Sequence, residues 1–216
     1  MTVRRTPVGV LVSGAGTNLL ALLRACKGDA YPARIALVIS NRRDAAALEV
    51  ARSWEVPFAA MPVSGFGGDS EARDRAMLER LRGAGVELVV CAGYDRILSE
   101  EVCRAYPDAI LNVHPSLLPA FAGTMRAVED ALDYGVTVTG CTVQLLAPGA
   151  IDGGPVVLQA AVPVEPGDDA DRLRARIHAE EWRLLPAAVA LWSTGRLRRE
   201  GRRVDILPAA PALRGA

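Results

Sequence analysis

Short apolar runs alternate with helical patterns along the first half of the chain. Apolar, β-branched runs bounded by polar residues predict strands, and apolar residues at helical spacing predict helices. The expected strands cover residues 8–12, 34–39, 57–61, 88–92 and 109–113. The expected helices between them cover residues 19–25, 45–54 and 70–82. This alternation predicts an α/β fold with a doubly wound, mostly parallel sheet and right-handed crossovers.

The pattern changes in the second half of the chain. A helix is expected over residues 126–134, and two long apolar runs, 136–146 and 156–164, are joined by a Gly-rich loop. A connection of that kind predicts antiparallel pairing, so the sheet should have an antiparallel C-terminal portion. A long helix over 170–192 contains Pro186, where we expect a kink or a break. A hairpin over 196–206 and a loose tail at 207–216 complete the expected elements of a single domain, residues 1–216.

Composition and charge indicate a protein that handles small molecules. The chain has 25 Lys and Arg against 25 Asp and Glu, so no charge excess points to a nucleic acid or a membrane. The N-terminal apolar run passes straight into Gly-rich sequence, as a first strand does, and no stretch reaches transmembrane length. The 4 cysteines have neither C-x-x-C spacing nor a zinc-like histidine cluster. We therefore expect a cytoplasmic protein with no metal site, no nucleic-acid partner and no membrane partner.

Residues 13–18, Ser-Gly-Ala-Gly-Thr-Asn, lie between the first expected strand and helix. Glycines let backbone N–H groups approach an anion, and a helix N-terminus favours negative charge, so this segment is a candidate phosphate site. A tight turn explains the same residues equally well. The dinucleotide-binding pattern is incomplete, because Leu19 stands where its third glycine belongs. Arg42 and Arg43, after the second strand, still leave an NADP site open.

Asn112 and His114 stand two residues apart at the end of an apolar strand. The period of a strand puts both side chains on one side, at the sheet edge where doubly wound folds bind ligands. An amide and an imidazole can both donate to a developing oxyanion. The alternative is a histidine that is satisfied by nearby backbone. Because the chain has only 2 histidines, His114 and His178, we favour a functional role for His114.

Two further segments are ambiguous when each is considered alone. Asp152 lies in a Gly-rich loop, where a carboxylate near His114 would favour the imidazolium, but an Asp-Gly turn is the simpler interpretation. Residues 91–98 follow the fourth strand, where Ile97 and Leu98 could floor a pocket for an apolar ring. Core packing is the simpler interpretation of those two side chains.

Taken in order, the segments resemble the glycinamide ribonucleotide formyltransferases, folate-dependent enzymes of purine biosynthesis. The matching segments are SGAGTNL (13–19), ISN (39–41), AGYDRIL (92–98), LNVHPSLLPAF (111–121), VTGCTV (138–143) and IDGGPVVLQAAVPV (151–164). The resemblance implies a Rossmann-like formyltransferase fold and transfer of a formyl group from the co-substrate 10-formyltetrahydrofolate to the amine of glycinamide ribonucleotide. It also implies a phosphate-binding half over 1–108 and a catalytic and folate-binding half over 109–206. We expect a monomer or a homodimer.

The resemblance implies a role for each matching side chain. The catalytic residues would be Asn112, His114 and Asp152. The ribonucleotide would be held by Gly16, Thr17, Asn18 and Glu181. The folate would be held by Asp95, Arg96, Ile97, Leu98 and Asn112.

Several positions depart from the pattern of the family. The unusual residues are Ser70 in place of an arginine, Asp95 in place of an apolar methionine, and Met125 and Gln144 in place of histidines. Another amine acceptor, such as an amino sugar, therefore stays open as an alternative. A nucleotide-binding oxidoreductase is the alternative from a different class. Transfer to Met-tRNA and hydrolysis of formyltetrahydrofolate are disfavoured, because those enzymes carry an extra domain that we do not find here.

Overall fold

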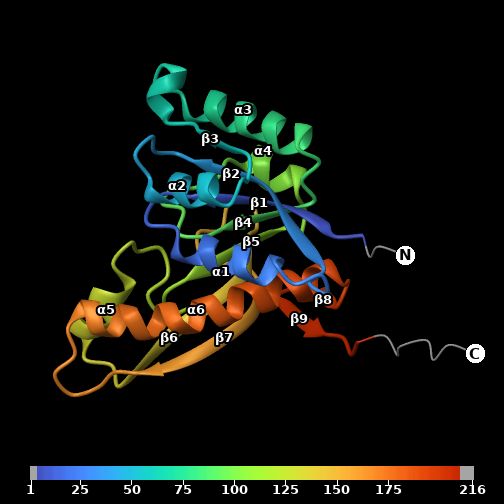
Figure 1. Cartoon of the computed structure of the whole chain (residues 1–216). Helices are drawn as coiled ribbons and strands as arrows, with labels where there is room; N and C mark the ends of the chain where they lie inside the picture. The colour runs from blue at the N-terminus through green and yellow to red at the C-terminus, as the bar shows by residue number, and fades with distance from the viewer. Residues whose placement is uncertain (1–3, 210–216) are drawn as a thin grey trace, which may run out of the picture.

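The computed structural model describes residues 4–209, which contain one sheet of 7 strands in the order β3-β2-β1-β4-β5-β6-β7 (Figure 1). Its strands are β1 (Thr6–Val12), β2 (Ala33–Ser40), β3 (Phe58–Ala60), β4 (Leu88–Cys91), β5 (Ile110–His114), β6 (Val138–Leu145) and β7 (Val156–Pro163). Neighbouring strands from β3 to β5 pair in parallel, whereas β6 is antiparallel to both β5 and β7. The predicted α/β fold, with its antiparallel C-terminal portion, is confirmed.

Helices cover both faces of this sheet. They are α1 (Thr17–Cys26), α2 (Ala46–Ser53), the 3₁₀ turn η1 (Val63–Phe66), α3 (Ser70–Gly83), α4 (Glu100–Ala105), α5 (Ala127–Tyr134) and α6 (Ala170–Ser193). Apolar side chains of α1, α2, α5 and α6 belong to one buried core, and those of α3 and α4 belong to a second. The two cores lie on opposite sides of the sheet, and Figure 1 shows α3 and α4 apart from α1 and α6.

Side chains of a buried strand point alternately to the two faces of the sheet, and this explains the two cores. In β1, Val8, Val10 and Val12 belong to the core under α1 and α6, whereas Leu11 belongs to the core under α3. Successive side chains of a strand point to opposite faces, so a central parallel strand must be apolar at nearly every position. This requirement is the physical reason why unbroken apolar runs predicted these strands.

The strand order reverses between β1 and β4, and this reversal positions the site. Consecutive connections leave the two strands in opposite directions, which opens a crevice at their carboxyl ends. The loops that follow β1 and β4 meet there, and the Ser13 N–H donates to the Gly93 carbonyl at 3.0 Å. Residues that follow three neighbouring parallel strands therefore converge at one edge of the sheet.

Some predicted elements differ from the structure. The sequence pattern missed α4, a short helix whose first turn is capped by the Ser99 side chain. Of the kink or break expected at Pro186, the break is wrong, because α6 runs unbroken from Ala170 to Ser193, and the kink stays a prediction. A proline removes a single backbone donor, and in a 24-residue helix with a long buried face, tertiary packing outweighs that loss.

The C-terminal hairpin is confirmed, but it lies outside the main sheet. Strands β8 (Leu197–Glu200) and β9 (Arg203–Ile206) pair with each other in a sheet of 2 strands. The predicted tail lies mostly outside the described residues, which end at 209. No helix within residues 4–209 has the length and apolar character that a membrane crossing requires.

The closest approach of β6 and β7 requires a glycine, which gives a test of the fold. A Cβ at Gly140 would lie 1.9 Å from the Ala160 carbonyl oxygen, so Gly140→Ala must push two paired strands apart. We expect a loss of about 2–4 kcal/mol in the free energy of unfolding, measured by urea denaturation. The control, Gly83→Ala at the end of α3, has open space around it and should be neutral or slightly stabilising. Equal stabilities of the two variants would contradict this packing.

Candidate active site

A cleft of about 770 Å³ opens at the carboxyl edge of the sheet, across the point where the strand order reverses. Every residue that the sequence predicted for the site lines this cleft. The residues come from the start of α1, the loop after β4, strand β5, the loop after β6 and the middle of α6. Segments more than 160 positions apart in the chain thus meet in one hollow, as Asn18 and Glu181 do through a direct hydrogen bond.

The loop before α1 depends on glycine. Gly16 has φ 80°, in the left-handed region, and a Cβ there would lie 2.8 Å from the Ala47 backbone. The Ala47 N–H also donates to the Gly14 carbonyl at 3.1 Å, which fixes the loop against α2. No side chain caps α1, so the N–H groups of its first turn face the cleft uncapped. A helix N-terminus of this kind suits an anion.

Asn18 and Glu181 form a buried polar pair beside that loop. The Asn18 amide nitrogen donates to Glu181 Oε2 at 2.8 Å, and the two residues are 6% and 3% exposed. Burial raises the pKa of Glu181 to about 7, although the hydrogen bond from Asn18 acts in the opposite direction. Asn18 Oδ1 is buried without a hydrogen-bond partner among the described residues. The pair therefore offers a free acceptor and a carboxyl group that changes charge near neutral pH.

The loop after β4 is tied to the ends of β1 and β2 through Asp95. Its carboxylate accepts from the Asn41 amide at 2.7 Å, lies 3.0 Å from the Ser13 hydroxyl, and pairs with Arg42. Burial acts to raise the pKa of Asp95, but hydrogen bonds from Asn41 and Ser13 and the charge of Arg42 together hold it below its usual range. This carboxylate thus joins three strand ends and is already engaged within the protein.

The three residues that follow Asp95 all line the cleft, but they differ in how far they are buried. Leu98 is 8% exposed and belongs to the core under α3, as expected from the interpretation of this side chain as core packing. Ile97 is 70% exposed at the wall of the cleft, and the guanidinium of Arg96 also lies largely in solvent. When an apolar ligand covers such an isoleucine, burial of its apolar surface contributes favourable binding free energy.

Strand β5 carries Asn112 and His114 on one face, as the period of the strand predicts. Their neighbours Leu111 and Val113 point into the opposite core, under α6. In the antiparallel pairing with β6, Asn112 lies opposite Gln144 and His114 lies opposite Thr142. Polar side chains therefore alternate with apolar ones on both strands, and the polar face is the one that borders the cleft.

His114 is held between two oxygen acceptors. Its Nδ1 lies 3.4 Å from Asp152 Oδ2, and its Nε2 lies 3.0 Å from the Phe121 carbonyl oxygen. The ring is 6% exposed, so neither nitrogen is freely hydrated. Because both partners can only accept, a ring with a proton on each nitrogen satisfies both contacts. The side chain of Asn112 makes no hydrogen bond with residues 4–209, which leaves its amide available in the cleft.

The two loops that touch His114 both contain a residue with a left-handed backbone. Phe121 has φ 54° and Asp152 has φ 49°. Such a conformation costs a residue other than glycine about 1–3 kcal/mol and persists only where surrounding contacts impose it. Asp152 is held by the Gly123 N–H, which donates to its Oδ2 at 2.9 Å, and by Gln144. Strain of this kind is typical of functional sites.

Comparison with known proteins identifies the family. A family model described as "Formyl transferase" matches residues 7–189. The chain belongs to the formyl transferase family. Phosphoribosylglycinamide formyltransferase of Haemophilus influenzae is 38% identical over 191 residues, which is 88% of this chain and 89% of that protein. The same-named protein of Mycobacterium tuberculosis is 42% identical over 203 residues, which is 91% of this chain and 92% of that protein.

A solved structure supports the same assignment. Glycinamide ribonucleotide transformylase 1 from Symbiobacterium toebii is 48% identical, superposes with a TM-score of 0.91, and covers 94% of this chain and 95% of its own. The resemblance to folate-dependent formyltransferases is thereby confirmed at the level of family and fold.

Sequence reasoning assigned no role to Thr142 and His178 of this formyl transferase, and it noted Gln144 only as a departure from the family pattern. Thr142 and Gln144 share the polar face of β6, and the alternation of Thr, Val, Gln and Leu at 142–145 was the signal that could have found them. His178 lines the cleft one helical turn before Glu181. Burial, with a contribution from the charge of Arg174, lowers the pKa of His178.

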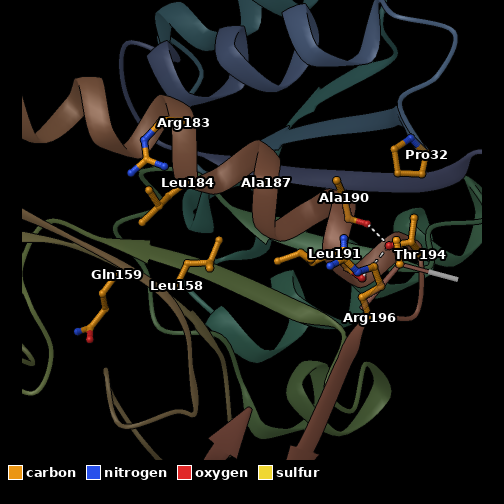
Figure 2. Close-up of a pocket in the computed structure, with 11 residues that line it drawn as sticks. Pro32, Leu158, Gln159, Arg183, Leu184, Ala187, Ala190, Leu191, Thr194 and Arg196 are labelled. Carbon is orange, nitrogen blue, oxygen red and sulfur yellow. Dashed lines mark hydrogen bonds between the residues drawn. The ribbon is translucent and has the colours of Figure 1, made fainter. Parts of the chain in front are cut away.

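A second hollow, of about 680 Å³, lies away from these residues. Figure 2 shows it between α6, with Arg183, Leu184 and Ala187, and β7, with Leu158 and Gln159. None of the predicted site residues lines it. In the part of the chain that the structure describes, no group of three or more His, Cys, Asp or Glu side chains could hold a metal ion.

The raised pKa of Glu181 predicts how stability depends on pH. Below 4.5, its ordinary value, the carboxyl group is protonated in the folded and unfolded states, and its burial costs nothing. As the pH rises towards 7, the unfolded state loses the proton first, so the wild-type protein is destabilised relative to Glu181→Gln. We expect the variant to gain up to about 3 kcal/mol over wild type between pH 5 and pH 8, measured as the change in unfolding midpoint.

The neighbouring position supplies the control for that measurement. Glu180 is partly exposed and pairs with Arg183, so Glu180→Gln should follow the wild-type pH profile. If Glu181→Gln and wild type lose stability in parallel between pH 5 and pH 8, the buried carboxyl does not titrate as described.

Proposed function

We propose that this protein transfers the formyl group of 10-formyltetrahydrofolate to the amine of glycinamide ribonucleotide, a step of de novo purine biosynthesis. The observation that carries the proposal is the contact of 3.4 Å between Asp152 Oδ2 and His114 Nδ1, in a cleft that Asn112 also lines. The relatives named phosphoribosylglycinamide formyltransferase, which match about nine-tenths of the chain, support the same acceptor.

The acceptor would bind at the start of α1. Backbone N–H groups around Gly16 and Thr17 suit a phosphate, because they are uncapped and the helix dipole favours negative charge. Asn18 Oδ1, buried without a partner among residues 4–209, suits a donor such as a ribose hydroxyl. Glu181 would contact the ribonucleotide from α6, beside Asn18.

The donor would bind along the loop after β4. The exposed side chain of Ile97 and the backbone of residues 96–98 offer an apolar wall with polar edges to a pterin ring. Asp95 and Asn112 were also predicted to contact folate. Because the Asp95 carboxylate already binds Asn41 and Arg42, we propose that Asp95 shapes this wall and that its side chain does not bind the ring directly.

Bound 10-formyltetrahydrofolate supplies the formyl carbon that the amine attacks. His114 Nε2 and the Asn112 amide donate to the formyl oxygen as negative charge develops on it. Asp152 stabilises the doubly protonated ring of His114 and can accept the proton that the amine releases. The adduct then collapses as the bond between the formyl carbon and N10 of the folate breaks, and that proton passes to N10, so that formylated product and tetrahydrofolate leave. None of these steps calls for a metal.

One contact must open before His114 can act in this way. The Phe121 carbonyl oxygen lies 3.0 Å from His114 Nε2, where the mechanism requires the formyl oxygen. A carbonyl oxygen in that place is a chemical stand-in for the substrate carbonyl. The strained backbone of Phe121 indicates that the loop is held there by its contacts and can give way when they are replaced.

The remaining expectations about the whole protein stay proposals. We propose one domain over residues 1–216, with halves over 1–108 and 109–206 that the continuous pairing of β4 with β5 joins. Residues 96–98 belong to the first half although they would hold the donor. A monomer or a homodimer, a cytoplasmic location, and the lack of nucleic-acid and membrane partners also remain predictions.

An amine panel tests the proposed reaction. Release of tetrahydrofolate from the donor, followed by absorbance, should require glycinamide ribonucleotide and should not occur with amino sugars or other amines. Turnover with an amino sugar alone would assign another acceptor, and release without any amine would indicate a hydrolase. Binding of NADPH without formyl transfer would support the oxidoreductase alternative and contradict the proposal.

Two variants test the assigned chemistry. His114→Ala removes an oxyanion donor, and Asp152→Asn removes the charge beside the ring, so each should lower kcat by about 10²–10³-fold. Folate binding, measured by calorimetry, should change little, because neither side chain belongs to the wall at 96–98. Asp171→Asn, with a side chain 94% exposed on α6, serves as the control and should keep wild-type turnover. Near-normal kcat in either site variant would overturn the assignment.

A further inference from the structure

Gln144 is a fully buried polar residue with both ends of its amide engaged. It is 0% exposed, its Nε2 donates to Asp152 Oδ1 at 3.0 Å, and its Oε1 accepts from the Gly154 N–H at 3.0 Å. Both partners belong to the loop that follows β6. A single side chain thus ties that loop back to the strand from which the loop departs.

The same loop is pressed tightly against the end of β6. A Cβ at Gly154 would lie 1.8 Å from the Leu145 carbonyl oxygen, and the Leu145 N–H donates to the Pro155 carbonyl at 2.9 Å. Within this turn Asp152 has a left-handed backbone, with φ 49°. Contacts from outside the turn must hold such a residue in place. Gln144 provides two of them, one to the Asp152 side chain and one to the Gly154 N–H.

The two oxygens of the Asp152 carboxylate have different partners. Oδ1 accepts from Gln144, whereas Oδ2 accepts from the Gly123 N–H at 2.9 Å and faces His114 Nδ1 at 3.4 Å. A carboxylate that is fixed at one oxygen cannot rotate freely about its terminal bond. The bonds from Gln144 and Gly123 together fix which oxygen the imidazole meets, and Gln144 is the side chain that supplies one of them.

We propose that Gln144 is a positioning residue that holds the Asp152 carboxylate towards His114. The proposal rests on the proposed function, in which Asp152 acts through His114. Gln144 does not line the cleft, so it acts through Asp152 and does not touch a substrate. An amide is neutral across the working pH range, so the Gln144 side chain does not itself change charge with pH.

The neighbouring polar residue on β6 supports this interpretation. Thr142, two positions earlier on the same face, donates to the Ser116 carbonyl at 2.7 Å and accepts from the Leu118 N–H at 3.0 Å. It therefore holds the loop that follows His114, as Gln144 holds the loop that contains Asp152. The polar face of one strand fixes both loops that bring the carboxylate and the ring together.

Two variants of similar size test the proposal. Gln144→Met removes both hydrogen bonds, and we expect kcat to fall about 10–100-fold while KM for both substrates stays within about twofold, as an effect on the transition state alone requires. Gln144→Glu keeps an acceptor for Gly154 but places a second carboxyl group against Asp152. Like charges at that distance disfavour ionisation, so the acid limb of the kcat profile should move up by about one pH unit or more.

A measurement that does not need turnover accompanies the kinetics. Carbon-13 NMR of the aspartate carboxyl groups, with Asp152 assigned by its loss in Asp152→Asn, should show the Asp152 titration displaced to higher pH in Gln144→Glu. Gln159→Met is the matched control. Its amide on β7 bonds to the Leu118 carbonyl and to Thr142, away from Asp152, so the Asp152 titration should stay as in wild type.

The outcomes separate the two proposals. If wild type fails to formylate glycinamide ribonucleotide, the proposed function fails, and the NMR titration still decides whether Gln144 holds Asp152. If wild type is active but Gln144→Met keeps wild-type kcat, or the Asp152 titration is the same in wild type and Gln144→Glu, Gln144 is not a positioning residue. Should Gln144→Met not fold, the titration of Gln144→Glu decides alone. If Gln144→Glu loses stability while the Asp152 titration is unchanged, Gln144 contributes to packing and does not position Asp152.

Discussion

The antiparallel register of β5 and β6 is the constraint on which the site depends. It places Asn112 opposite Gln144 and His114 opposite Thr142, so four polar side chains share one face at the sheet edge. The chain leaves β6 just beyond Gln144 and returns as β7, so Asp152 lies in the loop of residues 146–155 that joins the two strands. Register and loop length together bring a carboxylate within 3.4 Å of an imidazole from another strand. A slip of β6 by one residue against β5 would turn Thr142 and Gln144 towards the apolar core beneath α6 and away from Asn112 and His114.

The rest of the cleft is organised by contacts between strand ends. The loops after β1 and β4 are joined by the bond from the Ser13 N–H to the Gly93 carbonyl, and Asp95 extends this junction to β2 through Asn41 and Arg42. The segments proposed for the acceptor and the donor are therefore parts of one hydrogen-bonded edge. A rigid edge of this kind favours catalysis, because it fixes the distance between two bound reactants without further ordering at the moment of reaction.

Elements that depend on local pattern could be predicted from the sequence. Buried strands such as β1 and β4 need apolar residues on both faces, and the common face of Asn112 and His114 follows from the period of a strand. The six-residue helix α4 was missed, because it is too short to show helical periodicity. The continuity of α6 through Pro186 could not be predicted, because the packing that holds this helix comes from residues distant in sequence. Nothing local indicated that Asp152 meets His114; only the family resemblance did.

The engaged state of Asp95 also could not be inferred from its own neighbours in the sequence. Its partners Ser13 and Asn41 follow two other strands, so the contact exists only once the strand order is known. Gln144 is a similar case, because the sequence showed that it departs from the family pattern but not that it is buried and bonded to Asp152. Residues that act through other residues are harder to recognise from a sequence than residues that belong to a family motif. For such residues the coordinates carry most of the information.

The proposed reaction requires Asn112, His114 and Asp152 to converge on one reacting carbonyl. A crystal structure with glycinamide ribonucleotide and an unreactive analogue of the formyl donor would show whether they do. We expect the analogue's carbonyl oxygen within hydrogen-bond distance of both His114 Nε2 and the Asn112 amide, with the Phe121 carbonyl displaced and Asp152 still against Nδ1. A donor carbonyl bound elsewhere, with His114 Nε2 still on Phe121, would contradict it.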